Sequence, residues 1–209
     1  MAGHKAESLM TLRQSFKRMV KSIFLLLVFP VYALYLLLRL TGSQDAVFAS
    51  FSQALSLIPG KIGIYVRAAF YRLACANTSD EISVGFLTVF SHADTTIQKG
   101  VYIGPQCNIG KCIIGKNTLI GSGVHILSGS AQHIFSDIET PIQEQGGEYI
   151  KISVGIDCWI GNKCMITSDI PNQCVVGTGT LIKKMNIRPG DIIVGNPAQV
   201  IKNRITTTS

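Results

Sequence analysis

The sequence contains few charged residues. Only 15% of its 209 residues are Asp, Glu, Lys or Arg, whereas 47% are hydrophobic. Such a chain is apolar for a soluble protein, which indicates contact with a membrane. Acidic residues are the scarcer kind, with 12 acids against 19 lysines and arginines and a formal net charge of +7. Because the basic residues lie beside apolar segments, this balance fits an anionic membrane surface better than nucleic acid, and we expect no nucleic-acid partner.

The six cysteines form no Cys-x-x-Cys pair. A zinc knuckle is therefore not expected, and we predict no metal requirement. Several cysteines lie next to positions of the repeat described below, where a small, partly buried side chain suffices. We expect reduced thiols in a cytosolic setting rather than disulfides.

The apolar segment near the amino terminus lacks both a charge and a prompt cleavage site. Residues 23–38 carry no charge, and Arg39 follows directly, so a cleaved secretory signal is not expected. Sixteen helical residues span about 24 Å, short of the roughly 30 Å hydrocarbon core, and Pro30 removes a helical hydrogen bond. With basic residues before it, the segment 23–40 is expected to be a re-entrant or kinked anchor on the cytoplasmic side. A full crossing remains the alternative.

Residues 1–78 are expected to comprise a basic tail, this apolar helix and amphipathic interfacial helices, with residues 20–75 contacting the membrane. Apolar side chains recur at spacings of three and four before Pro59-Gly60, and a basic, aromatic-rich stretch follows. Helices of this kind lie flat on a membrane or cover the first coil of a repeat domain, and the two roles are compatible.

The rest of the chain has neither helical spacing nor strict alternation. From Ile97 to Ile126, aliphatic residues recur at steps of six, six, five, six and six, and the period resumes between Val154 and Ile182. A hexapeptide period is typical of a parallel β-helix, in which each repeat forms one short side of a coil. The glycine that follows many of these residues allows the chain to turn a corner. We therefore predict a mainly β protein with a parallel β-helix over residues 79–198.

A polar insertion interrupts the repeat over residues 127–153. A loop of this length is uncommon in a compact domain unless it is functional, and loops on rigid scaffolds often carry binding and catalytic residues. Its side chains that suit such roles are His133, Asp137, Glu139, Glu144, Glu148 and Tyr149.

Four features together resemble the hexapeptide-repeat acyltransferases. They are the repeat, a histidine in the interrupting loop, the segment CWIGNKCMI (residues 158–166) and the ending VGNPAQVIKNR (residues 194–204). This family includes galactoside, maltose, serine, xenobiotic and polysaccharide O-acetyltransferases. The resemblance, which covers residues 82–204, implies a left-handed β-helix, acetyl-coenzyme A as co-substrate, a homotrimer and a short C-terminal helix within residues 199–209.

The resemblance also implies catalytic residues. The family places its general base in the interrupting loop, where this chain has His133, and His125 is the second candidate. The implied mechanism is direct transfer, in which the imidazole takes the proton of a hydroxyl that attacks the acetyl thioester. Asp137 or Glu139 is a candidate to orient His133.

The donor-binding residues are likewise implied by the family. Trp159 matches an aromatic residue beside the pantetheine arm, and Asn162 and Thr178 match positions that line the groove between subunits. Three lysines match positions near the coenzyme phosphates: Lys183, Lys184 and Lys202. The chain departs from the family at Gln199, where a basic residue is frequent.

These observations lead to one principal hypothesis and three alternatives. The principal one is a sugar O-acetyltransferase at the cytoplasmic face of a bacterial inner membrane, acting on a cell-surface polysaccharide or lipid-linked glycan precursor. The first alternative is acyl transfer to the amine of an amino sugar. The second is a zinc enzyme like the gamma-class carbonic anhydrases, with His92, His125 and His133 as ligands. The third is a non-enzymatic membrane scaffold.

Overall fold

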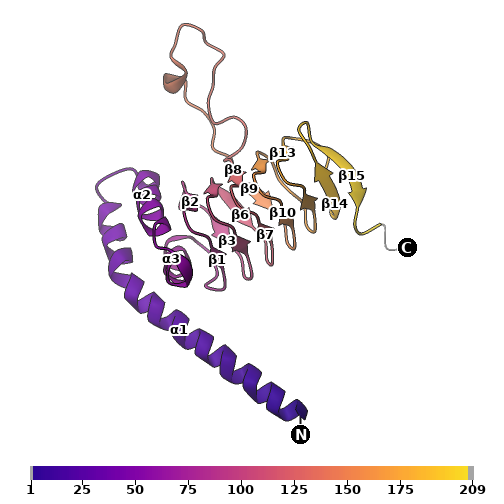
Figure 1. The fold of residues 1–209 in the computed structure, drawn as a ribbon. Coiled ribbons are helices and arrows are strands. Elements are labelled where there is room, and N and C mark those ends of the chain that lie inside the picture. Colours follow the sequence, from indigo (N-terminus) through magenta and orange to yellow (C-terminus); the bar gives the residue numbers. More distant parts are fainter. Residues whose placement is uncertain (1, 207–209) are drawn as a thin grey trace.

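The computed structural model describes residues 2–206, with side chains from residue 15 onward. Three helices are followed by a long stack of short strands, and an extended loop projects from the side of the stack (Figure 1). The helices are α1 (Ala2–Leu38), α2 (Gln44–Ser56) and α3 (Gly60–Ala74), and η1 (Ile142–Glu144) is a short 3-10 helix in the loop. The strands are β1 (Ser83–Val84), β2 (Val89–Phe90), β3 (Thr96–Ile97), β4 (Tyr102–Ile103), β5 (Asn108–Ile109), β6 (Cys112–Ile114), β7 (Leu119–Ile120), β8 (His125–Ile126), β9 (Ile152–Val154), β10 (Trp159–Ile160), β11 (Met165–Ile166), β12 (Val175–Val176), β13 (Leu181–Ile182), β14 (Asp191–Val194) and β15 (Gln199–Asn203).

The strands form three sheets that are the three sides of a left-handed β-helix. Their orders are β1-β4-β7-β10-β12-β14-β15 in the first sheet, β2-β5-β8-β11-β13 in the second and β3-β6-β9 in the third. Each strand therefore pairs with the strand one coil away, and the pairs between coils are parallel. The predicted parallel β-helix is confirmed.

The repeat aliphatics form inward columns, as predicted. In the first sheet Ile103, Ile120 and Ile160 stand in register across consecutive coils, and all three are fully buried. The glycine after each keeps the corner open to the next coil. At Gly104, which follows Ile103, a Cβ would come within 2.8 Å of the Ser122 nitrogen in the next coil, so a larger residue would push the coils apart.

All six cysteines are buried and free, which confirms the expectation of thiols rather than disulfides. Burial raises the pKa of Cys112 to about 12 and that of Cys158 to about 11. Neither side chain is a thiolate at neutral pH, so both act as small core residues.

The predicted C-terminal helix is wrong. Gln199–Asn203 forms β15, which pairs antiparallel with β14 through a turn at Gly195. The reason is that β14 is the outermost parallel strand and needs a partner for its free edge, which a helix would not provide. The insertion is also shorter than predicted, because β9 begins at Ile152, so that the excursion comprises residues 127–151. These residues are called the arm below.

The helix α1 is continuous through Pro30. Phe24, on one side of the proline, stacks on Tyr65 of α3 with ring centroids 5.1 Å apart, and Tyr35, on the other side, is buried against aromatic rings of α2 and α3. Packing on both sides outweighs the one lost hydrogen bond. The segment Ser15–Leu38 is long and apolar enough to cross a membrane, and only 11% of its most apolar window is buried.

The helices α2 and α3 cover the first coil, as one of the two predicted roles requires. The ring of Tyr71 lies 4.5 Å from that of Phe90 on β2. The hydroxyl of Ser52 shares a 2.8 Å hydrogen bond with the Tyr71 hydroxyl and accepts the amide of Phe90 at 2.8 Å. The first coil thus obtains from the helices the partners that a preceding coil would have supplied.

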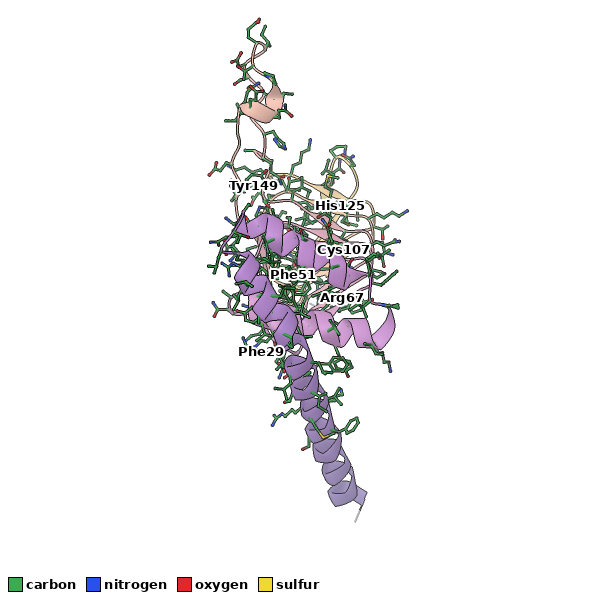
Figure 2. All side chains as sticks on the ribbon, turned by 90° about the vertical axis from the view of Figure 1, so that its left-hand side faces the viewer. Phe29, Phe51, Arg67, Cys107, His125 and Tyr149 are labelled. Atoms are coloured by element: carbon green, nitrogen blue, oxygen red, sulfur yellow. The ribbon has the colours of Figure 1, made fainter. Side chains whose placement is uncertain are left out.

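Arg67 joins this cap to the β-helix (Figure 2). Its side chain is fully buried and its partners are backbone carbonyls. Its Nε donates to the Val84 carbonyl at 3.0 Å, and its Nη1 donates to the carbonyls of Leu55 at 3.1 Å and Ile58 at 2.8 Å. One guanidinium therefore satisfies acceptors at the end of α2 and at the end of β1.

The root of the arm is held by an ion-pair cluster. Lys151, the last residue of the arm, lies 2.6 Å from one oxygen of Asp94, and Lys111 lies 3.5 Å from the other. The hydrogen bond from Lys151 holds the pKa of Asp94 below its ordinary value. Asp94 therefore fixes the point at which the arm returns to the coils.

Replacement of Arg67 by methionine should destabilise the cap. The change leaves several buried carbonyls without donors, so we expect the free energy of unfolding to fall by about 3 kcal/mol. Chemical denaturation followed by circular dichroism measures this value. Arg72→Met, at an exposed position of the same helix, is the control and should change stability by less than about 0.5 kcal/mol. Equal effects of the two substitutions would contradict this role of Arg67.

Asp94→Asn should loosen the root of the arm. Exposed ion pairs contribute roughly 0.2–1 kcal/mol, so amide hydrogen exchange over residues 145–155 should accelerate about two- to five-fold. Asp157→Asn is the control, because it removes the ion pair between Asp157 and Arg204, which is similarly exposed. Because the pKa of Asp94 is lowered in the folded protein, its stabilisation is present at neutral pH and is lost only as the pH falls below the ordinary aspartate value of about 4. Faster exchange in the wild type already at pH 6 would contradict this assignment.

Candidate functional site

The arm leaves the second sheet after β8 and returns to the third sheet at β9, so it emerges from one edge of the β-helix (Figure 1). Its apolar side chains are largely uncovered. Phe135 is 74% exposed and Ile138 is 92% exposed. These side chains therefore do not pack onto the coils of their own chain.

Asp137 organises the tip of the arm. Its carboxylate accepts the Glu139 amide at 2.9 Å and the Thr140 hydroxyl at 2.7 Å, and these bonds lower its pKa. The Gln145 side chain closes the tip by donating to the carbonyls of Asp137 and Thr140, both at 2.7 Å. The hydrogen bonds of Asp137 thus serve the turn, and Glu139 contributes its amide to the same turn.

His133 lies on the outgoing leg of the arm, where the two legs are fastened together. The Ile134 amide donates to the Gly146 carbonyl at 3.0 Å, and the Glu148 amide donates to the Ala131 carbonyl at 2.8 Å. A Cβ at position 147 would come within 1.9 Å of the Gln132 oxygen, so a glycine is required for the legs to approach. The backbone of His133 is therefore held on both sides while its imidazole is exposed to solvent.

A cavity of about 330 Å³ lies at the root of the arm. His125 and Asn108 reach it from neighbouring strands, and Gln132 and Tyr149 reach it from the two legs. His92 also lines the cavity. Its Nδ1 is 2.8 Å from the Ser91 hydroxyl, and its ring lies 5.3 Å from that of Tyr149. Figure 2 labels both His125 and Tyr149 near the foot of the projecting loop.

The three histidines of the zinc alternative do not converge. His92 and His125 line the cavity, whereas His133 is not among its lining residues. Within the part of the chain that the structure describes, no group of three His, Cys, Asp or Glu side chains is placed to hold a metal ion. The geometry therefore does not fit a three-histidine zinc site.

The residues expected to bind the donor lie in four places. Trp159 stands on β10 of the first sheet, 56% exposed, in register with Leu119 on one side and Val175 on the other. Asn162 and Thr178 share the next corner, where Asn162 accepts the Ser122 amide at 2.8 Å.

The lysines lie elsewhere on the surface. Lys183 and Lys184 follow β13 and are exposed at the corner from which the arm also leaves. Lys202 is exposed on β15, opposite Ile192. Within one copy, the arm thus leaves from the same edge of the β-helix as Lys183 and Lys184, whereas Trp159 lies on a different sheet.

The cavity at the root of the arm was not predicted from the sequence. Asn108 and His125 occupy equivalent outward positions in consecutive coils, each one residue before an inward isoleucine. This spacing of 17 residues was a usable signal. Tyr149 and Ser91 carried no comparable signal, because their proximity depends on where the arm returns.

Comparisons with known proteins agree with this architecture. Residues 94–128 match the family described as bacterial transferase hexapeptide (six repeats). The chain is 30% identical over 108 residues to a probable acetyltransferase of Mycobacterium tuberculosis, covering 45% of this chain and 36% of the relative. It is 31% identical over 119 residues to chloramphenicol acetyltransferase of Klebsiella aerogenes, covering 47% and 54%. The chain thus spans between about a third and about half of the length of these relatives.

Solved structures share the fold. A maltose O-acetyltransferase from Clostridium difficile superposes with a TM-score of 0.65 at 21% identity, covering 78% of this chain and 89% of that one. A galactoside acetyltransferase in complex with coenzyme A superposes with a TM-score of 0.60 at 19% identity, covering 78% and 84%. Residues 94–128 thus match the hexapeptide-repeat model, and the chain shares the left-handed β-helix fold of these two solved acetyltransferases.

Proposed function

We propose that this protein transfers an acetyl group from acetyl-coenzyme A to a hydroxyl group of a sugar. The observation that carries the proposal is a histidine-bearing arm fastened to a hexapeptide β-helix. The relatives with detectable sequence similarity are named acetyltransferases. The galactoside acetyltransferase with the same fold binds coenzyme A, which supports this donor.

In the proposed mechanism, His133 is the general base. Its imidazole is exposed to solvent, and histidine is the side chain that most often serves as a general base. It takes the proton of the acceptor hydroxyl while the oxygen attacks the thioester carbonyl. When the carbon–sulfur bond breaks, the imidazolium returns the proton to the sulfur of coenzyme A. The buried, protonated thiols of Cys112 and Cys158 provide no nucleophile for an acyl-enzyme.

The donor is proposed to lie between two copies of the chain. Trp159 would contact the pantetheine arm, and the corner at Asn162 and Thr178 would line the groove. The lysines at positions 183, 184 and 202 would meet the phosphates as point charges. Gln199 is exposed on β15 and adds no charge to this surface. These residues lie in four places in one copy, which supports a site in which a second copy brings His133 to the donor.

Two uncovered apolar surfaces support a homotrimer. One is the arm, with Phe135 and Ile138. The other is a ladder on the first sheet, where Tyr102, Leu119 and Trp159 stand in register and are each exposed by about half. Apolar surfaces of this kind mark interaction sites, and a threefold arrangement would let the arm of one copy reach the neighbour.

The proposed acceptor is a polysaccharide or lipid-linked glycan at the cytoplasmic face of a bacterial inner membrane. The membrane location is supported by α1, whose inward face packs on α3 while Leu26, Leu27 and Phe29 remain exposed. A helix packed along one side on the folded domain suits attachment to one leaflet rather than a crossing with lipid all round.

An assay with purified protein, acetyl-coenzyme A and candidate glycans tests the proposal through release of free thiol. His133→Ala should lower kcat by about 10²- to 10⁴-fold, the usual contribution of a general base, with little change in thermal stability because the side chain is exposed. His125→Ala is the matched comparison, and its main effect should be on the KM of the acceptor. Full activity of the His133 variant, with activity lost in the His125 variant, would transfer the role of base to the cavity at the root of the arm.

A further inference from the structure

A groove lies between α1, α3 and the first two coils of the β-helix, and none of the residues proposed above for catalysis or donor binding lines it. Its volume is about 350 Å³. Its walls are mainly apolar, with Leu25 from α1, Ile64 and Tyr65 from α3, Ile82 from the first coil and Val101 from the second. The stack of Phe24 on Tyr65 fixes one wall.

The end of the groove nearer the amino terminus is basic. Lys17 and Lys21 of α1 line both this groove and an adjoining hollow of about 380 Å³, to which Arg18 and Lys99 also contribute. Two carboxylates oppose these four cations. Asp80 lies 3.8 Å from Lys21, and Glu81 lies 3.1 Å from Lys99. Among the described residues, Lys17 and Arg18 form no salt bridge within 4 Å, so the site retains an excess of positive charge.

Along α1, basic side chains are followed by apolar ones, which is the order of headgroup and acyl chain in a phospholipid. The cations lie at residues 17–21, Leu25 lines the apolar part, and Leu26 and Leu27 beyond it are uncovered. The groove therefore adjoins the surface of α1 that is proposed to contact lipid. Its volume is at the lower end of the roughly 300–1,000 Å³ of ligand pockets, so it suits part of one acyl chain rather than a whole lipid.

We propose that this groove binds one anionic phospholipid, with its phosphate held by Lys17 and Lys21 and the start of one acyl chain against Leu25, Ile64 and Tyr65. Lysine binds phosphate as a point charge, and two flexible ammonium groups suit a headgroup whose exact shape varies. The inference rests on the membrane attachment proposed above but not on acetyl transfer. Loss of lipid binding and loss of catalysis are therefore separate outcomes.

Native mass spectrometry of the full chain in neutral detergent tests this site. Dioleoylphosphatidylglycerol is titrated against dioleoylphosphatidylcholine, which has the same chains but no net charge. We expect one tightly bound phosphatidylglycerol per chain, retained at a concentration at least ten-fold lower than phosphatidylcholine. Lys17→Gln/Lys21→Gln should abolish that preference. Lys116→Gln/Lys163→Gln removes the same charge from two exposed positions outside the groove and should preserve it.

Two further measurements distinguish a lipid headgroup from free phosphate and control for misfolding of the variants. Inorganic phosphate and glycerol 3-phosphate should not displace the lipid at millimolar concentration, because they lack the acyl chain. Lys17→Gln alone leaves the Lys21–Asp80 ion pair intact and should weaken the preference at an unchanged unfolding temperature. Equal retention of both lipids, an unaltered preference in the double lysine variant, or displacement by inorganic phosphate would each overturn the proposal.

Discussion

Each coil of this protein obtains its backbone hydrogen bonds from the next coil, and this requirement governs the whole architecture. A strand of two residues is not stable alone, so the stack must be covered wherever it ends. At the first end, α2 and α3 supply the cover, and Arg67 joins them to β1 through carbonyl contacts. At the last end, β15 folds back on β14. The segments on both sides of the parallel coils thereby close the stack.

The same requirement makes the coils a rigid support for the arm. The chain leaves the stack after β8 and returns at β9 without disturbing the pairing of either strand, since β8 still bonds β5 and β11 and β9 still bonds β6. The rigid coils therefore act as a fixed base for the arm. Glycine at 147 and the Asp94 cluster then hold its two legs, so that an exposed histidine has a defined position on an otherwise open loop.

Much of this architecture was predictable because the repeat is a local signal. The six-residue period identified the inward isoleucines, and the gap in the period identified the arm to within two residues. The covering role of α2 and α3 was one of two roles that their apolar spacing allowed. The C-terminal strand was missed because it is determined by the free edge of β14, a tertiary feature. Helix α1 passes through Pro30 because of aromatic packing against α3, which local sequence does not reveal.

The site was predictable only in part, for the same reason. His133 was singled out because it lies where the repeat is interrupted, at the position where the family it resembles has its base, and its role stays a prediction. The repeat places Trp159 at an outward position. The side chains that meet at the root of the arm come from β5, β8 and both legs of the arm, so their proximity depends on the path of the loop. The hydrogen bonds of Asp137 within the tip likewise depend on a turn that residue spacing does not specify.

We propose above that the chemistry takes place in a cleft shared by two copies of the chain. A structure of the assembled protein with bound coenzyme A is the decisive measurement. We expect a trimer in which the coenzyme runs between neighbours, with its sulfur near His133 of one copy and its pantetheine group beside Trp159 of another. Coenzyme A bound wholly within one copy, or with its sulfur remote from His133, would rule out the shared cleft.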